Sequence, residues 1–326
     1  SNEEILLLLQ LGSGDTLEYD KSQTMVDLFM EQVRRTPNAI AVVDRESRIT
    51  YNELDEQSSA LAHWLVREKG VEPDDFVVVM MPRVKEFMVA VLGIWKAGAT
   101  YVPIDLEYPE ERKRFIADDC GAKLILSTEN WPSQVLSGPS VKCGINLSKP
   151  SGLAYMIYTS GSTGQPKGVM IGQDGLLNYV HSTVKINGIS ASDRISAYRS
   201  FSFDSHIEEF FPSLAIGASV YIIPEESRKD ISAIESFLND NGISVAYFTT
   251  SLAVLLYKSC SLPVRFVGAV GEKLNGVKSG ANNGVKILNT YGPTECTDHI
   301  STFWLEDSRK YENIPIGRPL HNGVVL

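Results

Sequence analysis

Apolar positions along the chain switch between helical spacing and short unbroken runs. Residues 24–36 carry apolar side chains every three or four positions, which predicts an amphipathic helix that stops before Pro37. Residues 76–81 (FVVVMM) are apolar without interruption, as is typical of a strand buried on both faces. Residues 84–96 return to helical spacing, and Gly98 is a natural C-terminal cap. The pattern therefore predicts a strand with a helix on either side of it in the chain.

The same alternation continues on both sides of this segment. Thr50 and Glu53 form a capping-box pattern, which predicts a helix that ends near Gly70. Segment 128–150 is irregular and is interpreted as a linker. The other predicted strands are 40–43, 101–104, 123–127, 153–158, 169–171, 219–223, 245–249, 265–270 and 285–288, and the other clear helices are 109–121 and 231–239. Such alternation predicts the α/β fold class: two doubly wound, largely parallel sheets with flanking helices.

Composition and charge narrow the class of protein. The 326 residues are 43% hydrophobic and carry a formal net charge of −10, which is typical of a folded globular protein and excludes a disordered or fibrous one. An acidic chain without basic runs is a poor nucleic-acid binder. The four cysteines are far apart, which argues against a zinc site or a disulfide framework. The apolar run 87–95 is too short to span a bilayer, and no basic residue precedes the run 5–9. We therefore expect a cytoplasmic protein with neither nucleic-acid nor membrane partners.

In doubly wound sheets, ligands bind at loops beyond the carboxyl ends of strands, and one such loop is unusual. Residues 158–168 read YTSGSTGQPKG. Glycines let backbone N–H groups turn toward an anion, hydroxyls add donors, and Lys167 adds positive charge. The segment is not a P-loop of the GxxxxGK[ST] type, because Pro166 and Gly168 flank the lysine. It predicts a phosphate-binding loop, and a flexible surface loop of small residues is the alternative.

The segment YTSGSTGQPKG is similar to the phosphate loop of the adenylate-forming superfamily, and its surroundings resemble the amino-acid adenylation domains of nonribosomal peptide synthetases. Further motifs along the chain match the family and stand in the family's order: 49–65 and 96–105 before this loop, and Phe203-Asp204 with the next helix, 289–295 (NTYGPTE) and 314–319 (IPIGRP) after it. The resemblance covers about residues 23–326. It implies a leader at 1–22 and an N-terminal adenylation core at 23–326, with αβ subdomains of roughly 23–150 and 151–326.

The resemblance implies an ATP-dependent amino-acid adenylating ligase. The substrate carboxylate attacks the α-phosphorus of ATP, pyrophosphate leaves, and the aminoacyl adenylate is loaded onto a carrier-protein domain. ATP and Mg²⁺ are the implied cofactors, and phosphopantetheine belongs to the partner carrier domain. Because both reactants are anionic, such an enzyme works by positioning and by electrostatic stabilisation.

The resemblance also assigns nucleotide-binding residues. Tyr291 would stack on adenine, Asn289 would bond its edge, Thr294 would donate to the α-phosphate, and Glu295 would bind Mg²⁺. Core packing is the alternative for Tyr291, a helix cap for Glu272 and a solvated loop position for Glu295. The implied catalytic residues are Lys167, Thr163, Thr294 and Glu295. The remaining implied nucleotide contacts are Thr159, Ser160, Gly161, Ser162, Gly164, Gly271, Glu272, Thr290 and Gly292.

Asp204 matches the family's aspartate that pairs with the substrate ammonium, and an N-terminal helix cap is its alternative, since Ser205 and Glu208 form a capping box. Two carboxylates among the implied pocket residues favour a basic or polar side chain. Two alternatives compete: Glu208 only caps the helix, and Asp298 only pairs with His299. The implied lining residues are Ser205, Glu208, Tyr247, Gly268, Val270, Thr290, Asp298 and His299.

The family's later ribose-binding aspartate, hinge and lysine-bearing C-terminal lid have no counterpart before Leu326. We therefore expect an N-terminal fragment of an adenylation domain with weak activity. An acyl-CoA or aryl-acid ligase is an alternative, although a substrate without an amine gains nothing from Asp204. A non-catalytic module that keeps the fold is another alternative, and the intact loop with Lys167 and Glu295 argues against it.

Overall fold

The protein divides into two compact units. A computed structural model describes residues 2–45, 47–136, 144–160, 165–275, 277, 284–306 and 311–325. One unit, here the N-unit, comprises Asp20–Leu177 with Ser200–Asp204, and the other, the C-unit, comprises Ser1–Tyr19, Asn178–Arg199 and Ser205–Leu326. The division falls inside helix α7 (Gln173–Asn187), whereas the sequence placed a boundary near residue 150. The difference arises because the first two strands after residue 150 pair into the sheet of the N-unit.

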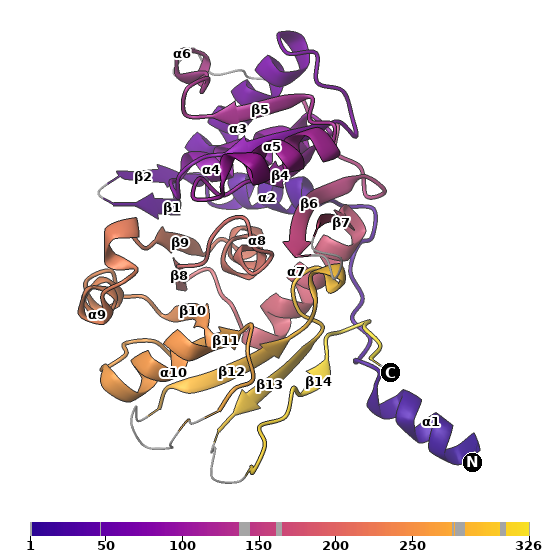
Figure 1. Ribbon diagram of the computed structural model, residues 1–326, viewed down its shortest axis with the longest axis vertical. Helices are drawn as coiled ribbons and strands as arrows, with labels where there is room; N and C mark the ends of the chain where they lie inside the picture. The colour runs from indigo at the N-terminus through magenta and orange to yellow at the C-terminus, as the bar shows by residue number, and fades with distance from the viewer. Residues whose placement is uncertain are drawn as a thin grey trace. The chain divides into compact units, whose positions relative to one another are not determined.

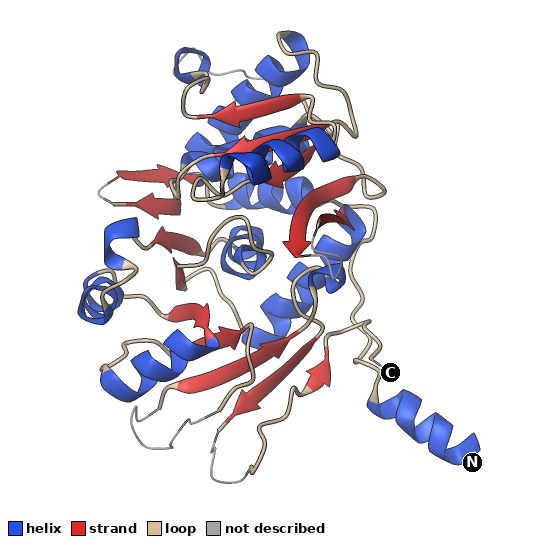
Figure 2. Ribbon diagram, in the orientation of Figure 1, coloured by secondary structure: helices blue, strands red, loops and turns tan. Residues whose placement is uncertain are grey.

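The N-unit is built on a largely parallel sheet (Figures 1 and 2). The strands in spatial order are β5 (Leu124–Ser127), β3 (Phe76–Met80), β4 (Thr100–Pro103), β6 (Leu153–Ser160) and β7 (Pro166–Gly172). Only β7 is antiparallel to its neighbour. Val77, Val78 and Val79 are fully or almost fully buried, as the unbroken run FVVVMM predicted.

The helices of the N-unit that begin at Met25 and Tyr51 each start with a capping box. The hydroxyl of Thr50 accepts from the backbone N–H of Glu53, whose carboxylate accepts from Thr50 in return, so the predicted capping box is confirmed. The helices are α2 (Met25–Arg35), α3 (Tyr51–Arg67), α4 (Glu86–Lys96), α5 (Glu110–Asp119) and α6 (Ser133–Leu136), and a hairpin of β1 (Ile40–Asp44) and β2 (Ser47–Thr50) precedes α3. At the end of α4, buried Lys96 donates to Asp55 of α3 at 2.6 Å, which joins the two helices.

The C-unit contains a second sheet with a parallel centre and an antiparallel edge. Its strands in spatial order are β14 (Arg318–Pro319), β13 (Ser301–Leu305), β12 (Lys286–Tyr291), β11 (Phe266–Val270), β10 (Val245–Thr249), β8 (Arg194–Ala197) and β9 (Ser219–Ile222). In the parallel pair β10–β11, Tyr247 lies opposite Gly268. The predicted α/β fold class with largely parallel sheets is confirmed.

Three of the described helices in the C-unit connect its parallel strands: α8 (His206–Ile216), α9 (Ile231–Asp240) and α10 (Thr250–Ser259). The unit also contains α1 (Asn2–Leu11), which lies before the first strand in the chain, and the short turns η1 (Glu225–Ser227) and η2 (Thr294–Cys296). Helix α8 ends at Gly217, whose φ of 89° suits glycine. Among the helices of the described residues, none combines the length and the apolar character that crossing a bilayer requires.

Candidate active site

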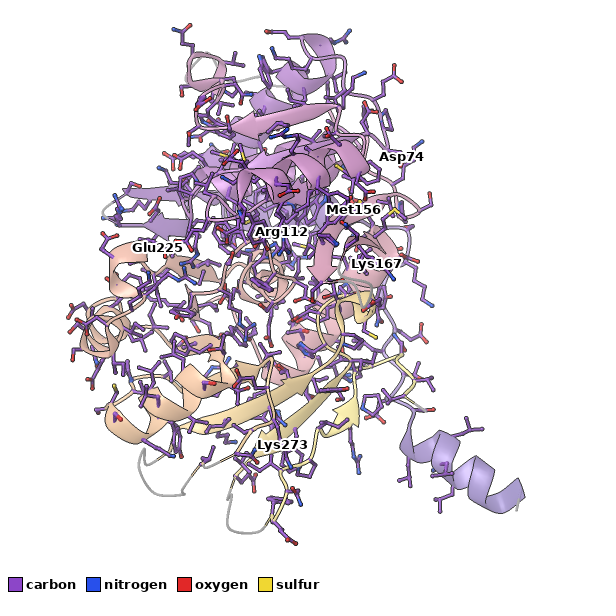
Figure 3. All side chains as sticks on the ribbon, in the orientation of Figure 1. Asp74, Arg112, Met156, Lys167, Glu225 and Lys273 are labelled. Atoms are coloured by element: carbon purple, nitrogen blue, oxygen red, sulfur yellow. The ribbon has the colours of Figure 1, made fainter. Side chains whose placement is uncertain are left out.

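The described ends of the predicted phosphate loop lie on two paired strands. Strands β6 and β7 pair antiparallel, with Thr159 opposite Lys167 and Ser160 opposite Pro166. Lys167 is exposed on β7 (Figure 3). The strand expected at 169–171 begins three residues earlier, because the hairpin partner extends the pairing back to Pro166. Four of the predicted contacts (Gly161, Ser162, Thr163, Gly164) lie outside the described residues.

Asp204 ends a short segment of the N-unit that is anchored to the loop after β4 and to α4. Within this segment, Ser200 donates to Asp105 at 2.5 Å, and Phe201 stacks on Phe87 with 4.1 Å between ring centroids. Asp204 is half-buried and directly precedes Ser205, the N-cap residue of α8. The side chain of Ser205 makes no capping hydrogen bond, so the capping box that suggested a helix-cap role is not formed by Ser205. The pairing of Asp204 with a substrate ammonium stays a prediction.

The carboxyl ends of β11 and β12 border a pocket of about 280 Å³ in the C-unit. Six residues that the resemblance assigned to the nucleotide meet there. They are Gly271, Glu272, Asn289, Thr290, Tyr291 and Gly292. Val270, expected in the amino-acid pocket, also lines this one, and Ile314 and Ile316 of the IPIGRP motif add apolar surface. An apolar pocket with a few convergent polar groups is typical of a small-molecule site.

Two side chains give this pocket its recognition chemistry. Tyr291 is 53% exposed, so the core-packing alternative is wrong and its ring is available to a ligand. The amide nitrogen of Asn289 donates to the carbonyl of Pro315 at 2.9 Å, which orients the side chain and leaves acceptor capacity on its oxygen. Glu272 accepts from the hydroxyl of Ser251, and the described residues 273–275 that follow it form no helix for it to cap.

Thr294 and Glu295 lie in the turn η2, shortly after β12. Thr294 is half-buried and Glu295 is exposed. No hydrogen bond from a described residue occupies the Glu295 carboxylate, which is a hard oxygen donor. Mg²⁺ takes one or two carboxylates and completes its shell with water and phosphate oxygens. The residue therefore fits the metal that the resemblance implies.

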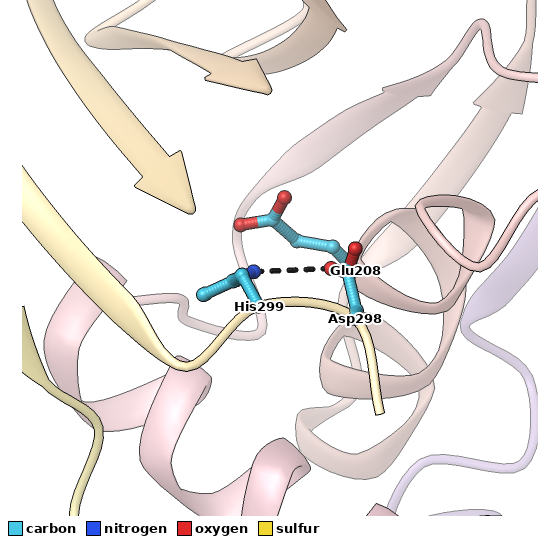
Figure 4. A group of neighbouring side chains, drawn as sticks. All are labelled: Glu208, Asp298 and His299. Carbon is cyan, nitrogen blue, oxygen red and sulfur yellow. Dashed lines mark hydrogen bonds and ion pairs between the residues drawn. The ribbon is translucent and has the colours of Figure 1, made fainter. Parts of the chain in front are cut away.

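A buried ionisable cluster lies elsewhere in the C-unit and contains Glu208, Asp298 and His299 (Figure 4). One ligand-type atom from each lies within 4.8 Å of the others. The Nδ1 atom of His299 lies 3.0 Å from Oδ2 of Asp298, and the hydroxyl of Tyr179 donates to the same oxygen at 2.6 Å. The pairing of Asp298 with His299, one of the two alternatives, is therefore present.

Two residues that the sequence did not single out neutralise and orient Glu208. The guanidinium Nη1 of Arg199 lies 3.2 Å from Oε2 of Glu208, and the Asn187 amide donates to Oε1 at 3.3 Å. Glu208 thus takes no part in capping α8, and that alternative is wrong. The available signal was a charged residue, Arg199, in the otherwise uncharged stretch between β8 and Asp204.

The pKa values in this cluster shift in opposite directions. Burial raises the pKa of Glu208 above its ordinary value, although the attraction of His299 and Arg199 opposes the shift. Burial would also raise the pKa of Asp298, but the hydrogen bond with His299 and the attraction of that ring hold it below its ordinary value. The pKa of His299 is raised, because the pull of Glu208 and Asp298 exceeds the effect of burial. The shifts therefore stabilise the protonated form of His299 and the ionised form of Asp298, while burial works against the ionised form of Glu208.

Tyr247 completes this cluster and covers Gly268. A Cβ added to Gly268 would lie 2.2 Å from Cδ1 of the Tyr247 ring, so the ring rests against bare backbone. The hydroxyl of Tyr247 accepts from Asn187 at 3.1 Å. None of Glu208, Tyr247, Asp298 and His299 exposes more than 2% of its surface, so these predicted lining residues are packed against one another.

Comparison with known proteins agrees with this arrangement. Residues 29–326 match the family model described as AMP-binding enzyme. Bacitracin synthase 1 from Bacillus licheniformis is 34% identical over 99% of this chain, which spans 6% of that protein. Tyrocidine synthase 1 from Brevibacillus parabrevis is 34% identical over 96% of the chain, which spans 30% of that protein. The chain therefore spans less than a third of either curated relative.

Solved structures show the same fold. The nonribosomal peptide synthetase FmoA3, in an AMPPNP-bound form, superposes with a TM-score of 0.89 at 26% identity, over 99% of this chain and 37% of that one. The N-terminal subdomain of Klebsiella oxytoca NpsA, in complex with anthranilyl-AMSN, superposes with a TM-score of 0.80 at 25% identity, over 92% of this chain and 82% of that one. The predicted relationship to the adenylation domains of nonribosomal peptide synthetases is confirmed, and this chain belongs to the AMP-binding enzyme family.

Proposed function

We propose that the protein activates an amino acid with ATP, forming an aminoacyl adenylate and releasing pyrophosphate, and that the product is loaded onto a carrier-protein domain. The observation that carries this proposal is the pocket at the ends of β11 and β12. Residues far apart in sequence, Gly271 and Glu272 on one side and Asn289 to Gly292 on the other, line one space with an exposed tyrosine ring. These are the positions that the adenylation-domain resemblance assigns to the nucleotide.

Within this proposal, each side chain positions one part of the reactants. The Tyr291 ring stacks on adenine, and the Asn289 oxygen accepts a hydrogen bond from the exocyclic amine of the base. Lys167 neutralises the departing pyrophosphate, and Thr294 donates to the α-phosphate. Glu295 would hold Mg²⁺, which when bound supplies charge stabilisation to the phosphate oxygens. No covalent intermediate with the protein is required.

Asp204 separates amino-acid activation from the runner-up, an aryl-acid or acyl-CoA ligase. A half-buried carboxylate directly before α8 can form a charge-assisted hydrogen bond with a substrate ammonium, whereas a substrate acid without an amine has no group to pair with it. The Asp204→Ala variant should lose most of its affinity for an aminoacyl-sulfamoyl adenosine, a stable analogue of the adenylate, while keeping its affinity for ATP. Unchanged affinity for the aminoacyl analogue would favour the runner-up.

Calorimetric titration with ATP and Mg²⁺ tests whether the protein binds the nucleotide, which the proposed function requires. A folded sample should bind ATP, and removal of Mg²⁺ should weaken the binding of ATP more than that of adenosine. A folded sample that binds neither nucleotide nor any aminoacyl analogue would support the alternative of a non-catalytic module.

The substrate side chain is proposed to be polar or basic, because two carboxylates lie among the pocket residues. A panel of aminoacyl analogues ranked by affinity tests this, and tightest binding by an aliphatic side chain would contradict it. The proposed partner is a carrier domain whose phosphopantetheine thiol accepts the aminoacyl group. The proposed location is the cytoplasm, which fits the lack of a disulfide among the described cysteines Cys120, Cys260 and Cys296, and which cell fractionation would test.

A further inference from the structure

Arg199 enters the buried cluster from the end of β8, and helix α8 fixes its position. The carboxylate of Glu209 accepts from the backbone N–H groups of Tyr198 and Arg199, at 3.0 and 3.1 Å. The adjacent residue on α8, Glu208, receives the Arg199 guanidinium. Two consecutive glutamates of one helix thus hold the backbone and the side chain of the same arginine, so its position does not depend on a ligand.

The guanidinium is buried and held by several acceptors. The side chains of Arg199 and Glu208 are 3% and 0% exposed. Besides Glu208, the Arg199 guanidinium donates to the carbonyl of Ser205 at 2.9 Å and to that of Phe248 at 3.3 Å. Its carbon lies 5.5 Å from the centroid of the Tyr247 ring. A permanent cation therefore occupies the place beside Glu208 that a cationic substrate side chain would need.

The charged groups of the cluster are paired with one another without a substrate. The guanidinium of Arg199 pairs with Glu208, and the ring of His299 pairs with Asp298, while Tyr179, Tyr247 and Asn187 are neutral hydrogen-bonding neighbours. A cationic side chain entering this environment would add a net charge to a region that excludes water, which is costly. An acidic side chain would face the two carboxylates. A neutral side chain brings neither penalty.

Two buried nitrogens of the cluster, Nε2 of His299 and Nε of Arg199, have no hydrogen-bond partner among the described residues. Nδ1 of His299, in contrast, is engaged by Asp298. A buried donor left unsatisfied costs about 1–3 kcal/mol. A hydroxyl or amide oxygen on a substrate would satisfy Nε2 without adding charge. A divalent cation is a poorer partner for this site, because it would need Glu208 as a ligand and both oxygens of Glu208 already accept hydrogen bonds, from Arg199 and from Asn187.

We propose that Arg199 is a specificity-determining residue: by pairing with Glu208 it excludes cationic side chains and restricts the substrate to amino acids with a neutral side chain that carries a hydroxyl or an amide. The inference rests on the proposed amino-acid activation and selects one branch of it, polar rather than basic.

The experiment measures the affinity of wild type for seryl-, threonyl-, asparaginyl-, glutaminyl-, ornithyl- and lysyl-sulfamoyl adenosine by calorimetry. Wild type should bind the best neutral analogue at least about tenfold more tightly than either cationic one, since tenfold corresponds to about 1.4 kcal/mol. The Arg199→Met variant removes the cation that pairs with Glu208 and should shift that ratio toward the cationic analogues by about tenfold or more. The Arg199→Met/Glu208→Gln double variant, which lacks both charges, should restore the preference for neutral analogues.

Arg228→Met is the matched control, because Arg228 forms a partly exposed ion pair with Glu225 in the same unit and should leave every affinity unchanged. The proposal is overturned if wild type binds a cationic analogue most tightly, or if a folded Arg199→Met variant keeps the wild-type ratio. If that variant does not fold, as judged by circular dichroism, the wild-type ranking and the double variant decide. Failure of wild type to bind ATP or any analogue would instead contradict the proposed function.

Discussion

The guanidinium of Arg199 and the carboxylate of Glu208 form an ion pair at 3.2 Å in which neither side chain is more than 3% exposed. Removing one member of such a pair leaves an uncompensated buried charge, whereas removing both members does not. The same two residues therefore bear on stability as well as on specificity.

We expect Glu208→Gln to destabilise the protein by about 3–5 kcal/mol, as is usual when one partner of a buried ion pair is removed. The Arg199→Met/Glu208→Gln double variant should cost less than the sum of the single variants. Urea unfolding of the four proteins measures the coupling. As a control, Glu225→Gln breaks the partly exposed pair with Arg228 and should cost less than about 1 kcal/mol. Equal costs for the buried and the exposed pair would contradict this account.

His299 should make stability depend on pH. Its pKa in the folded protein lies above its ordinary value, because Glu208 and Asp298 attract the imidazolium more strongly than burial disfavours it. The stabilisation is therefore fully present below the pKa of about 6.5 expected for the unfolded chain, and it is lost as pH rises through the folded-state pKa. His299→Asn should lower the urea midpoint more at pH 6 than at pH 9. An equal loss at both values would show that the ring acts through packing alone.

The contact of Tyr247 with Gly268 predicts a packing effect that can be rescued. Gly268→Ala places a methyl group 2.2 Å from a ring carbon, and because the ring is fully buried it has little room to move. We expect a cost of about 1–3 kcal/mol, typical of overpacking a core. The added methyl should cost less in a Tyr247→Val background, where the ring is absent. A double-mutant cycle by urea unfolding measures this difference, and identical costs in both backgrounds would contradict the contact.

Local signals in the sequence were sufficient for much of the fold. The run at 76–81 became a buried strand, and the cap at Thr50 started a helix, because each depends on neighbouring residues alone. The Tyr291 region was also predictable, since a motif names a set of adjacent positions. The length of β7 was not, because pairing with β6 determines where it starts.

The buried cluster was only half predictable. Glu208, Asp298 and His299 were singled out by position, but the sequence does not show that Arg199 and Asn187 lie beside Glu208. That arrangement depends on tertiary packing, which brings the end of β8, the end of α7 and the first turn of α8 together. Two carboxylates counted from the sequence suggested a negative pocket, and the structure adds a cation of its own that the count omitted.

Tyr291→Ala should weaken ATP binding with little effect on folding. The ring is 53% exposed at the pocket and contributes little to the core, so its loss should change the free energy of unfolding by less than about 0.5 kcal/mol. Stacking of a base on an aromatic ring is worth about 1–3 kcal/mol, so the affinity for ATP should fall by that amount. Leu255→Ala, which removes another exposed apolar side chain of the C-unit, is the control and should leave ATP binding unchanged.

Lys167→Met should separate recognition of the phosphates from recognition of the base. Lys167 is exposed on β7, opposite Thr159 of β6, so the substitution should not disturb packing. A hydrogen bond to a charged group is worth about 1.5–3 kcal/mol, and ATP affinity should fall by that amount while adenosine affinity stays constant. Lys258→Met removes an exposed lysine from α10 and corrects for the change in net charge. If both variants lose the same ATP affinity, or if Lys167→Met weakens adenosine equally, then the hairpin does not contact the phosphates.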